Sequence, residues 1–194
     1  MKAPGPGHNG GPTLEPGVGW RRYCWRKARA DLLPQLPLEV VRIRVARAKA
    51  LGLPYRTYAT VRATAGQDIV AFMFSSNALN LLRETDTLAA DRSEVLAGLT
   101  ACGRLMAAQP PLDPETVGAR MRPFIDSCRA APAISITWSG LARWSGEWLS
   151  SQSLSRRGVL VVGETALERE WSVAGRMAGF LRGGPYFDAA ATPA

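Results

Sequence analysis

The sequence predicts an α/β protein: a basic N-terminal segment of about three helices, packed on or joined to a small three-layer α/β body with a mostly parallel sheet. Beyond residue 66, short apolar runs such as IVAFMF (69–74) and VLVV (159–162) alternate with amphipathic stretches of helical period. That alternation is typical of parallel strands joined by helices. Before residue 66 the apolar residues follow a helical period only, and many arginines separate them.

Four segments follow from composition. The Gly- and Pro-rich residues 1–19 carry too few large apolar side chains to offset the entropy of ordering, so we expect a disordered tail. The other segments are a basic helical segment at 20–66, the α/β body at 67–187 and a second disordered tail at 188–194.

Within the basic segment, prolines and glycines mark the expected helix ends. Helices are expected over 20–33, 38–52 and from Pro54 to about 65. Gly52 and Gly66 suit C-terminal caps. The second of these helices places Leu38, Val41, Val45 and Ala48 on one stripe.

The body reads as alternating strands and helices. Strands are expected at 68–74, 103–109 and 158–163, with a fourth candidate at 133–137. Helices are expected directly after the first strand, at 89–99, from Pro114, from about Trp138 and at 165–179.

The charge is concentrated at the N-terminal end. The chain has a net charge of +8, and residues 1–66 contain 12 Lys and Arg against 3 Asp and Glu. The remaining residues are nearly neutral, with 12 Arg against 13 acids. Such asymmetry favours a module that faces a polyanion, although a layer of solvated helices would have the same composition.

The stretch RVARAKALGLPYRTYATVRATAG (44–66) resembles a helix-turn-helix. Ala48 and Gly52 stand four apart as in that motif, and Tyr58 and Val61 occupy its locking positions. The stretch departs from the pattern at Leu53, a poor N-cap, and in the size of Tyr58.

The resemblance implies a DNA-binding surface. Arg56, Thr57 and Thr60 would face the major groove, joined by Tyr55. Phosphate contacts would come from Arg21, Arg22, Arg26, Lys27, Arg42, Arg47, Lys49 and Arg62. The first functional hypothesis is therefore a non-enzymatic regulatory or accessory protein that binds nucleic acid, DNA rather than RNA. An alternative is an adaptor that docks onto an acidic protein.

Trp138, Leu141, Trp144 and Trp148 share one face of an expected helix. This ridge is interpreted as core. If it were exposed instead, it would serve a partner or a homo-oligomer, because tryptophan dominates interface energetics.

Polar residues follow two of the expected strands. Ser75, Ser76 and Asn77 follow the first, and Glu164 and Thr165 follow the last. If the two strands are neighbours, these residues converge on a crevice that could hold a small ligand or a phosphate. The same hydroxyls would also serve as N-caps.

The stretch VVGETALEREWSVAGRMAG is similar in outline to the last motif of haloacid-dehalogenase-like phosphatases. The resemblance implies a magnesium-holding role for Glu164. The family's DxDxT nucleophile motif is replaced here by FSSNAL, so the activity is not carried over.

Other chemistry finds little support in the sequence. The single histidine, His8, lies in the tail, and neither a GxxxxGK[ST] nor a strand-linked GxGxxG motif occurs. The three cysteines lack the spacing of a disulfide framework or a zinc site. Glu168 and Glu170 are expected on the solvent face of the last helix. We predict no catalytic residue, metal or cofactor.

No apolar run approaches the roughly 20 residues of a membrane span. The first residues lack the apolar core of a secretory signal. The sequence therefore favours a cytoplasmic protein without a membrane span.

Overall fold

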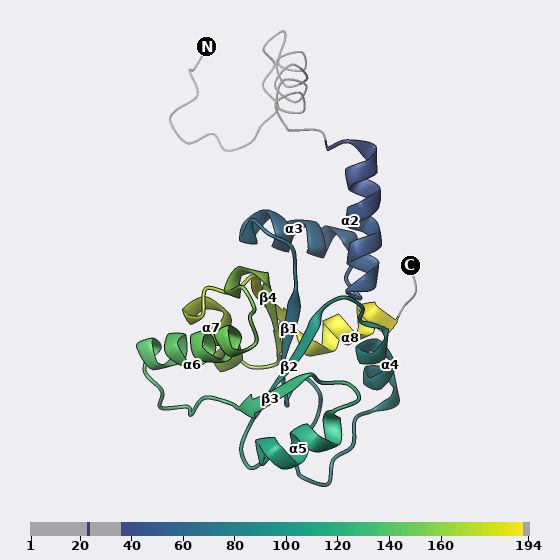
Figure 1. Cartoon of the computed structure of the whole chain (residues 1–194). Helices are drawn as coiled ribbons and strands as arrows, with labels where there is room; N and C mark the ends of the chain where they lie inside the picture. Colours follow the sequence, from purple (N-terminus) through teal and green to yellow (C-terminus); the bar gives the residue numbers. More distant parts are fainter. Residues whose placement is uncertain (1–22, 24–35, 192–194) are drawn as a thin grey trace, which may run out of the picture. The chain divides into compact units, whose positions relative to one another are not determined.

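The computed structural model describes residue 23 and residues 36–191 (Figure 1). The expected helix at 20–33 and the tail at 1–19 lie outside these residues, apart from Tyr23. The chain divides into two compact units, residues 1–41 and 42–194. Residues 42–66 of the basic helical segment fall in the same unit as the sheet.

The sheet has five strands in the order β3-β2-β1-β4-β5, and every neighbouring pair is parallel. The strands are β1 (Ala71–Ser75), β2 (Gly103–Ala108), β3 (Ser127–Ala130), β4 (Val159–Gly163) and β5 (Gly179–Arg182). The predicted α/β class with a parallel sheet is confirmed.

Seven α-helices accompany the sheet in the described part of the chain. They are α2 (Leu38–Ala50), α3 (Tyr55–Ala65), α4 (Ala90–Gly98), α5 (Pro114–Met121), α6 (Trp138–Ser151), α7 (Ala166–Ala174) and α8 (Gly183–Ala191). None of these helices is long and apolar enough to cross a membrane.

Two separate cores cover the two faces of the sheet, because successive side chains of a strand point to opposite sides. Phe72 and Phe74 of β1 pack on one side with residues of α3, α4, α5 and α8. Met73 of β1 packs on the other side with Trp148 of α6 and Trp171 of α7. Figure 1 shows α6 and α7 across the sheet from α4 and α8.

Local capping explains several helix boundaries. Asp113 accepts a hydrogen bond from the Thr116 amide, and Pro114 occupies the first turn of α5. Gly66 ends α3 at φ +76°, a backbone conformation that glycine adopts without strain. The helix starts expected at Pro114 and Trp138 are confirmed, as is the helix at 89–99 within one residue of each end.

The segment after β1 differs from its prediction. The strand begins at Ala71 rather than at residue 68, and residues 76–80 form a turn instead of a helix. The Ser75 hydroxyl accepts a hydrogen bond from the Ala78 amide, and the Leu81 amide bonds to the Ser76 carbonyl. These bonds close a tight turn in place of the first helical turn.

Two edge strands were not predicted, and the candidate strand at 133–137 does not form. The helix expected at 165–179 ends at Ala174, because Gly175 and then Arg176, at φ +52°, turn the chain. Residues 179–182 are thereby free to pair with β4 as β5. The final helix continues to Ala191, past the boundary expected at 187.

Candidate functional site

The carboxyl ends of β1 and β4 meet at the centre of the sheet. The chain adds β2 and β3 on one side of β1 and then returns to add β4 and β5 on the other. Loops that leave neighbouring strands toward opposite faces open a crevice at this switch point, where doubly wound proteins bind ligands. The pairing of β1 with β4 meets the condition for the crevice predicted at 75–77 and 163–165.

A buried carboxylate links the loops at this edge. Glu168 of α7 is fully buried. Its Oε1 accepts hydrogen bonds from the side-chain amides of Asn77 (2.8 Å) and Gln109 (3.3 Å). Its Oε2 accepts bonds from the backbone amides of Glu164 (2.6 Å) and Thr165 (2.8 Å). The expectation that Glu168 lies on the solvent face is wrong, because these four donors replace water.

The other predicted crevice residues also bond within the chain. The Thr165 hydroxyl accepts a bond from the Glu168 amide and so caps α7, as one reading of the sequence expected. The Ser76 hydroxyl accepts a hydrogen bond from the backbone amide of Gln109. The Glu164 Oε1 accepts a bond from the Gly184 amide at the start of α8. The predicted residues Asn77, Glu164 and Thr165 do come together here, but they bond to Glu168 instead of facing an open crevice.

This arrangement disfavours an anion. A free helix N-terminus attracts phosphate through its unpaired amides and its dipole. At α7 the Glu168 carboxylate already occupies that position, and Glu164 adds a second carboxylate beside it. The phosphate considered from the sequence would therefore meet two negative charges.

The residues at this edge also do not fit the magnesium that the phosphatase resemblance implies. Both oxygens of Glu168 are engaged by hydrogen-bond donors, and one oxygen of Glu164 accepts a backbone amide. The segment FSSNAL, which stands in place of that family's DxDxT motif, contains no acid. No group of three or more Asp, Glu, His or Cys residues that could hold a metal occurs among the described residues.

A pocket of about 90 Å³ opens beside this network. It is bounded by the end of β2, the loop after β3 and the first turns of α6 and α7. Its lining residues are Gln109, Pro132, Ala133, Ile134, Ile136, Trp138, Leu141, Leu167, Glu170 and Trp171. Gln109 thus belongs both to the pocket wall and to the hydrogen-bonded network around Glu168.

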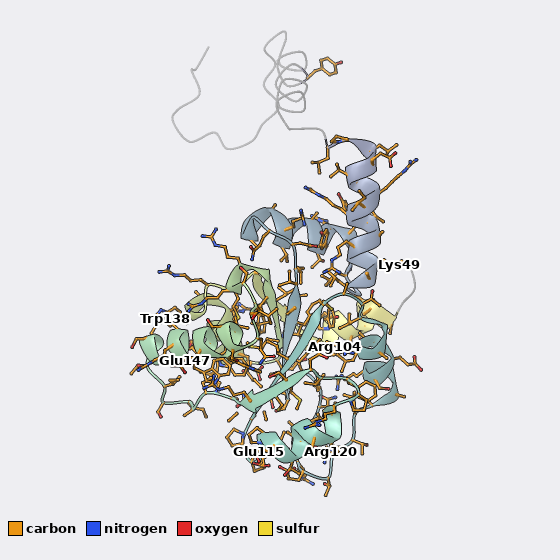
Figure 2. All side chains as sticks on the ribbon, viewed as in Figure 1. Lys49, Arg104, Glu115, Arg120, Trp138 and Glu147 are labelled. Carbon is orange, nitrogen blue, oxygen red and sulfur yellow. The ribbon has the colours of Figure 1, made fainter. Side chains whose placement is uncertain are left out.

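Three large apolar side chains around this pocket are exposed. The exposed fractions are 84% for Ile134, 56% for Trp138 and 43% for Leu167. Figure 2 shows Trp138 at the start of α6. Glu170, also in the lining, is exposed as the sequence predicted.

The rest of the tryptophan ridge is internal, as its interpretation as core predicted. Trp148 is buried and donates to the Ser127 hydroxyl. Trp144 is half-buried, donates to the Ala130 carbonyl and packs against Trp148 and Trp171. Trp138 alone of the three is exposed.

At the opposite end of β1, Asp68 gathers several residues of the basic helices. Arg47 donates to Asp68 (3.1 Å) and to the backbone carbonyls of Ile69, Thr100 and Ala101. Tyr58 donates to Asp68 (2.8 Å), and Arg62 lies 3.3 Å from the same carboxylate. Two of the predicted phosphate contacts, Arg47 and Arg62, are therefore engaged inside the chain.

The pKa shifts around Asp68 follow from these contacts. Burial alone would raise the pKa of Asp68, but the bond from Tyr58 and the charge of Arg47 outweigh it and lower that pKa. Burial, together with the bond to Asp68, raises the pKa of the Tyr58 hydroxyl. The cluster is thus most stable with Asp68 ionised and Tyr58 neutral.

The remaining residues predicted to contact nucleic acid differ in their solvent exposure. Arg42, Lys49, Arg56 and Thr60 are exposed, whereas Tyr55 and Thr57 are half-buried. The Thr60 hydroxyl donates to the Arg56 carbonyl within α3. The predicted contacts Arg21, Arg22, Arg26 and Lys27 lie outside the described residues, as does His8.

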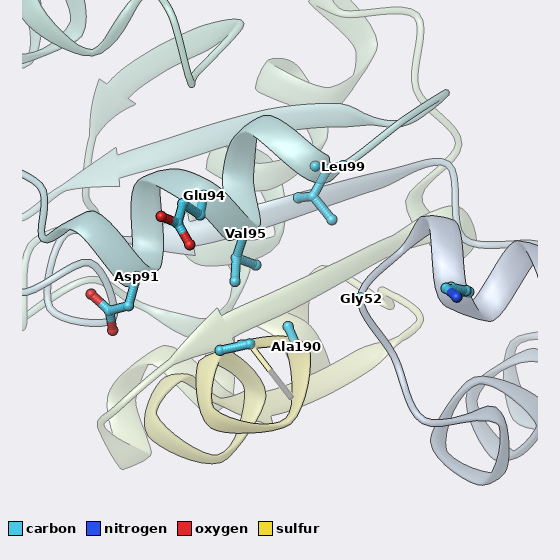
Figure 3. Close-up of a pocket in the computed structure, with 9 residues that line it drawn as sticks. Gly52, Asp91, Glu94, Val95, Leu99 and Ala190 are labelled. Atoms are coloured by element: carbon cyan, nitrogen blue, oxygen red, sulfur yellow. The ribbon is translucent and has the colours of Figure 1, made fainter. Parts of the chain in front are cut away.

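Lys49 lines a second pocket, of about 220 Å³, near the C-terminal end of α2 (Figure 3). Asp91 and Glu94 of α4 lie in the same lining, together with small and apolar residues of α4 and α8. Lys49 therefore shares its surroundings with two carboxylates.

The described cysteines are poor nucleophiles. Burial raises the pKa of the Cys128 thiol to about 11 and also raises the pKa of Cys102. Little reactive thiolate exists at neutral pH under these conditions.

Comparison with known proteins adds no identity: no family model, curated protein or solved structure matches the chain.

The sequence did not indicate the part that Gln109 takes in this network. Nor did it indicate that Glu168 would accept hydrogen bonds from four amides, or that Asp68 would pair with Arg47 and Arg62. A signal for Glu168 was present, since Thr165 followed three residues later by a glutamate is the pattern of a capping box. No comparable local signal exists for Asp68, because Arg47 and Arg62 approach it from separate helices.

Proposed function

We propose that this protein binds a small organic molecule at the carboxyl edge of its sheet, in the pocket beside Gln109. One observation carries the proposal. Beside the topological switch of a parallel sheet, a pocket with both apolar and polar surface opens next to the Gln109 side chain, which a buried carboxylate holds in place. Ligand sites commonly combine an apolar lining with a few precisely held polar groups.

The size of the pocket limits what enters. Sites for drug-sized ligands usually measure about 300–1,000 Å³, whereas this pocket measures about 90 Å³. An apolar cavity of about 150 Å³ is known to hold benzene. The pocket is smaller than that cavity, so the edge of a ring or a branched alkyl group is the part that enters it, and a whole nucleotide is too large.

The surroundings favour binding rather than catalysis. Exposed apolar side chains that gather in one place mark recognition surfaces, and Ile134, Trp138 and Leu167 do so here. Glu168, the nearest buried carboxylate, accepts four hydrogen bonds and has no lone pair left for a general base. Binding of a small molecule, unlike catalysis, requires no general base or nucleophile.

The proposal is tested with ¹⁵N-labelled protein and three probes that share one ring: benzyl alcohol, benzylamine and benzoate. At least one probe should shift the indole N–H signals of Trp138 and Trp171 in a saturable way, with a Kd on the order of 1 mM. Trp138→Ala should weaken that binding, while Val173→Ala, an exposed change on α7 outside the pocket, should not. If all three probes leave these signals unmoved at about 50 mM, the pocket is not a ligand site.

Nucleic-acid binding is a second candidate function, favoured by a different observation. Arg42, Lys49 and Arg56 are exposed on α2 and near the start of α3, within the part of the chain that carries a net charge of +9. Arginine and lysine at such positions neutralise phosphates and release counterions. Arg47 and Arg62 are left out of this proposal, because Asp68 engages them.

Fluorescence anisotropy with duplex DNA across a salt series tests this candidate. Reversing Arg42, Lys49 and Arg56 to Glu should reduce the slope of log K against log salt by about 2.7, since each phosphate contact contributes about 0.9. Reversal of Arg143, Arg157 and Arg176, which are exposed outside the basic helices, is the matched control. If both triple variants lose the same amount of DNA affinity, the loss reflects net charge alone and the assigned surface is rejected.

A further inference from the structure

We infer that the ligand of the pocket beside Gln109 is a small organic cation: an ammonium or guanidinium group attached to a flat apolar body. This inference rests on the proposed function and names its ligand class. It follows from the charges, the aromatic surface and the orientation of one amide around the pocket.

The pocket lining has a carboxylate and no cation. Glu170 is charged, and none of the ten lining residues is Lys, Arg or His. The neighbouring Arg169 is directed elsewhere, since its guanidinium stacks over the Phe180 ring at 5.3 Å. Although the chain carries a net charge of +8, the only charged group in this lining is a carboxylate, so the lining disfavours anionic ligands.

Glu168 adds a second negative charge behind the pocket wall. Its four hydrogen-bond donors are all neutral amides, so no ion pair cancels the charge. The dipole of α7 offsets about half a unit charge at most. Because the carboxylate is fully buried, water screens its field only weakly toward the adjacent pocket.

Gln109 supplies a hydrogen-bond acceptor. A carboxylate only accepts hydrogen bonds, so the Gln109 side chain must turn its NH₂ group toward Glu168. Its carbonyl oxygen is then the group available to a pocket ligand. That oxygen favours a ligand that carries N–H donors.

Trp138 supplies a surface for the cation and for the flat body. More than half of this side chain is exposed beside the pocket. Tryptophan has the most favourable ring for cation–π contact. A ligand with its ring edge in the pocket and its cation beside Trp138 and Glu170 would use both the aromatic face and the carboxylate of the lining.

The test compares the affinities of the three ring probes. Benzylamine should bind at least about threefold more tightly than benzyl alcohol, and benzoate should bind most weakly, since one partly exposed charge contact has an effect of that order. Glu170→Gln should remove the preference for benzylamine over benzyl alcohol. Glu94→Gln removes an equal charge from the lining of the pocket near α2 and should change nothing.

The outcomes separate the ligand class from the pocket itself. Equal binding of benzyl alcohol and benzylamine, or tighter binding of benzoate, would overturn the cation and leave the proposed function standing. Loss of benzylamine binding in Glu94→Gln rather than Glu170→Gln would place the cation in the other pocket and also overturn the inference. Binding of none of the probes would instead reject the proposed function.

Discussion

The two ends of the sheet each hold a carboxylate that gathers hydrogen bonds, but the partners differ in kind. Asp68, before β1, is about one-third exposed and pairs with two guanidinium groups and a phenol. Glu168, after β4, is fully buried and pairs with neutral amides only. The first carboxylate neutralises charges of the basic helices, while the second organises loops around an uncompensated charge.

This difference separates a structural cluster from a candidate site. Asp68 pairs with arginines that could otherwise bind a polyanion. The proposed nucleic-acid surface is therefore limited to Arg42, Lys49 and Arg56. A buried carboxylate with dipolar partners retains its field and extends it toward a neighbouring pocket. The same chemical group therefore neutralises arginines at one end of the sheet and, under the proposed function, adds negative charge beside the pocket at the other.

The largest expected effect is that of Glu168→Ala. The substitution leaves four donors unpaired beneath the surface, so the free energy of unfolding should fall by about 3–5 kcal/mol. Urea denaturation followed by circular dichroism measures the change. Glu170→Ala, two residues along the same helix and exposed, should stay within about 0.5 kcal/mol. Similar losses of unfolding free energy in the two variants would contradict the stabilising role of the four hydrogen bonds to Glu168.

Asp68→Asn should cost less, because its site is partly exposed and its cationic partners can turn to water. We expect the free energy of unfolding to fall by about 1–2 kcal/mol, with Arg47 and Arg62 left without their counter-ion. Asp91→Asn on α4 is the control and should change stability by less than about 0.5 kcal/mol. An unchanged melting temperature in Asp68→Asn would show that the ion pairs contribute nothing.

The stability difference between the wild type and Asp68→Asn should depend on pH in one direction. Since the pKa of Asp68 is lower in the folded state, its contribution is complete above the unfolded-state value of about 3.9 and is lost as the pH falls through the folded-state pKa. Urea midpoints of the two proteins should therefore differ at pH 6 and converge in stronger acid. A difference that grows below pH 4 would contradict the lowered pKa.

The smallest effect is expected for Thr165→Ala at the start of α7. It removes the cap on the Glu168 amide but leaves the glutamate carboxylate in place, so the loss should be about 1 kcal/mol. Thr60→Ala is the matched control, because its hydroxyl bonds only to the preceding turn of α3 and alanine favours helices. A larger loss from Thr60→Ala than from Thr165→Ala would contradict the capping role.

The central strands and most helix starts were predictable, while the edges of the sheet were not. Short apolar runs and helix-starting residues such as Pro114 act over a few neighbouring residues, so they can be recognised locally. The four residues of β3 (SCRA) and of β5 (GFLR) have no distinctive pattern. They are extended because β2 and β4 offer backbone partners at the sheet edges.

The candidate site shows the same division. Ser76, Asn77 and Glu164 were expected at one crevice because parallel strands end at a common edge, and the pairing of β1 with β4 satisfied the condition. The sequence did not indicate that Gln109, directly after β2, would join them, nor that Glu168 would bond to Asn77 and to the Glu164 amide. Those contacts depend on which strands are neighbours, which no local pattern encodes.

The sequence by itself determined the alternation of strands and helices, the excess of charge before residue 66 and the scarcity of histidine and cysteine chemistry. These properties follow from composition and from periods of a few residues. Only the tertiary structure decided which arginines reach water and which acid is buried. The physical reason is that burial removes water from a polar group, which must then find partners brought near by the folded chain, whatever their distance in sequence.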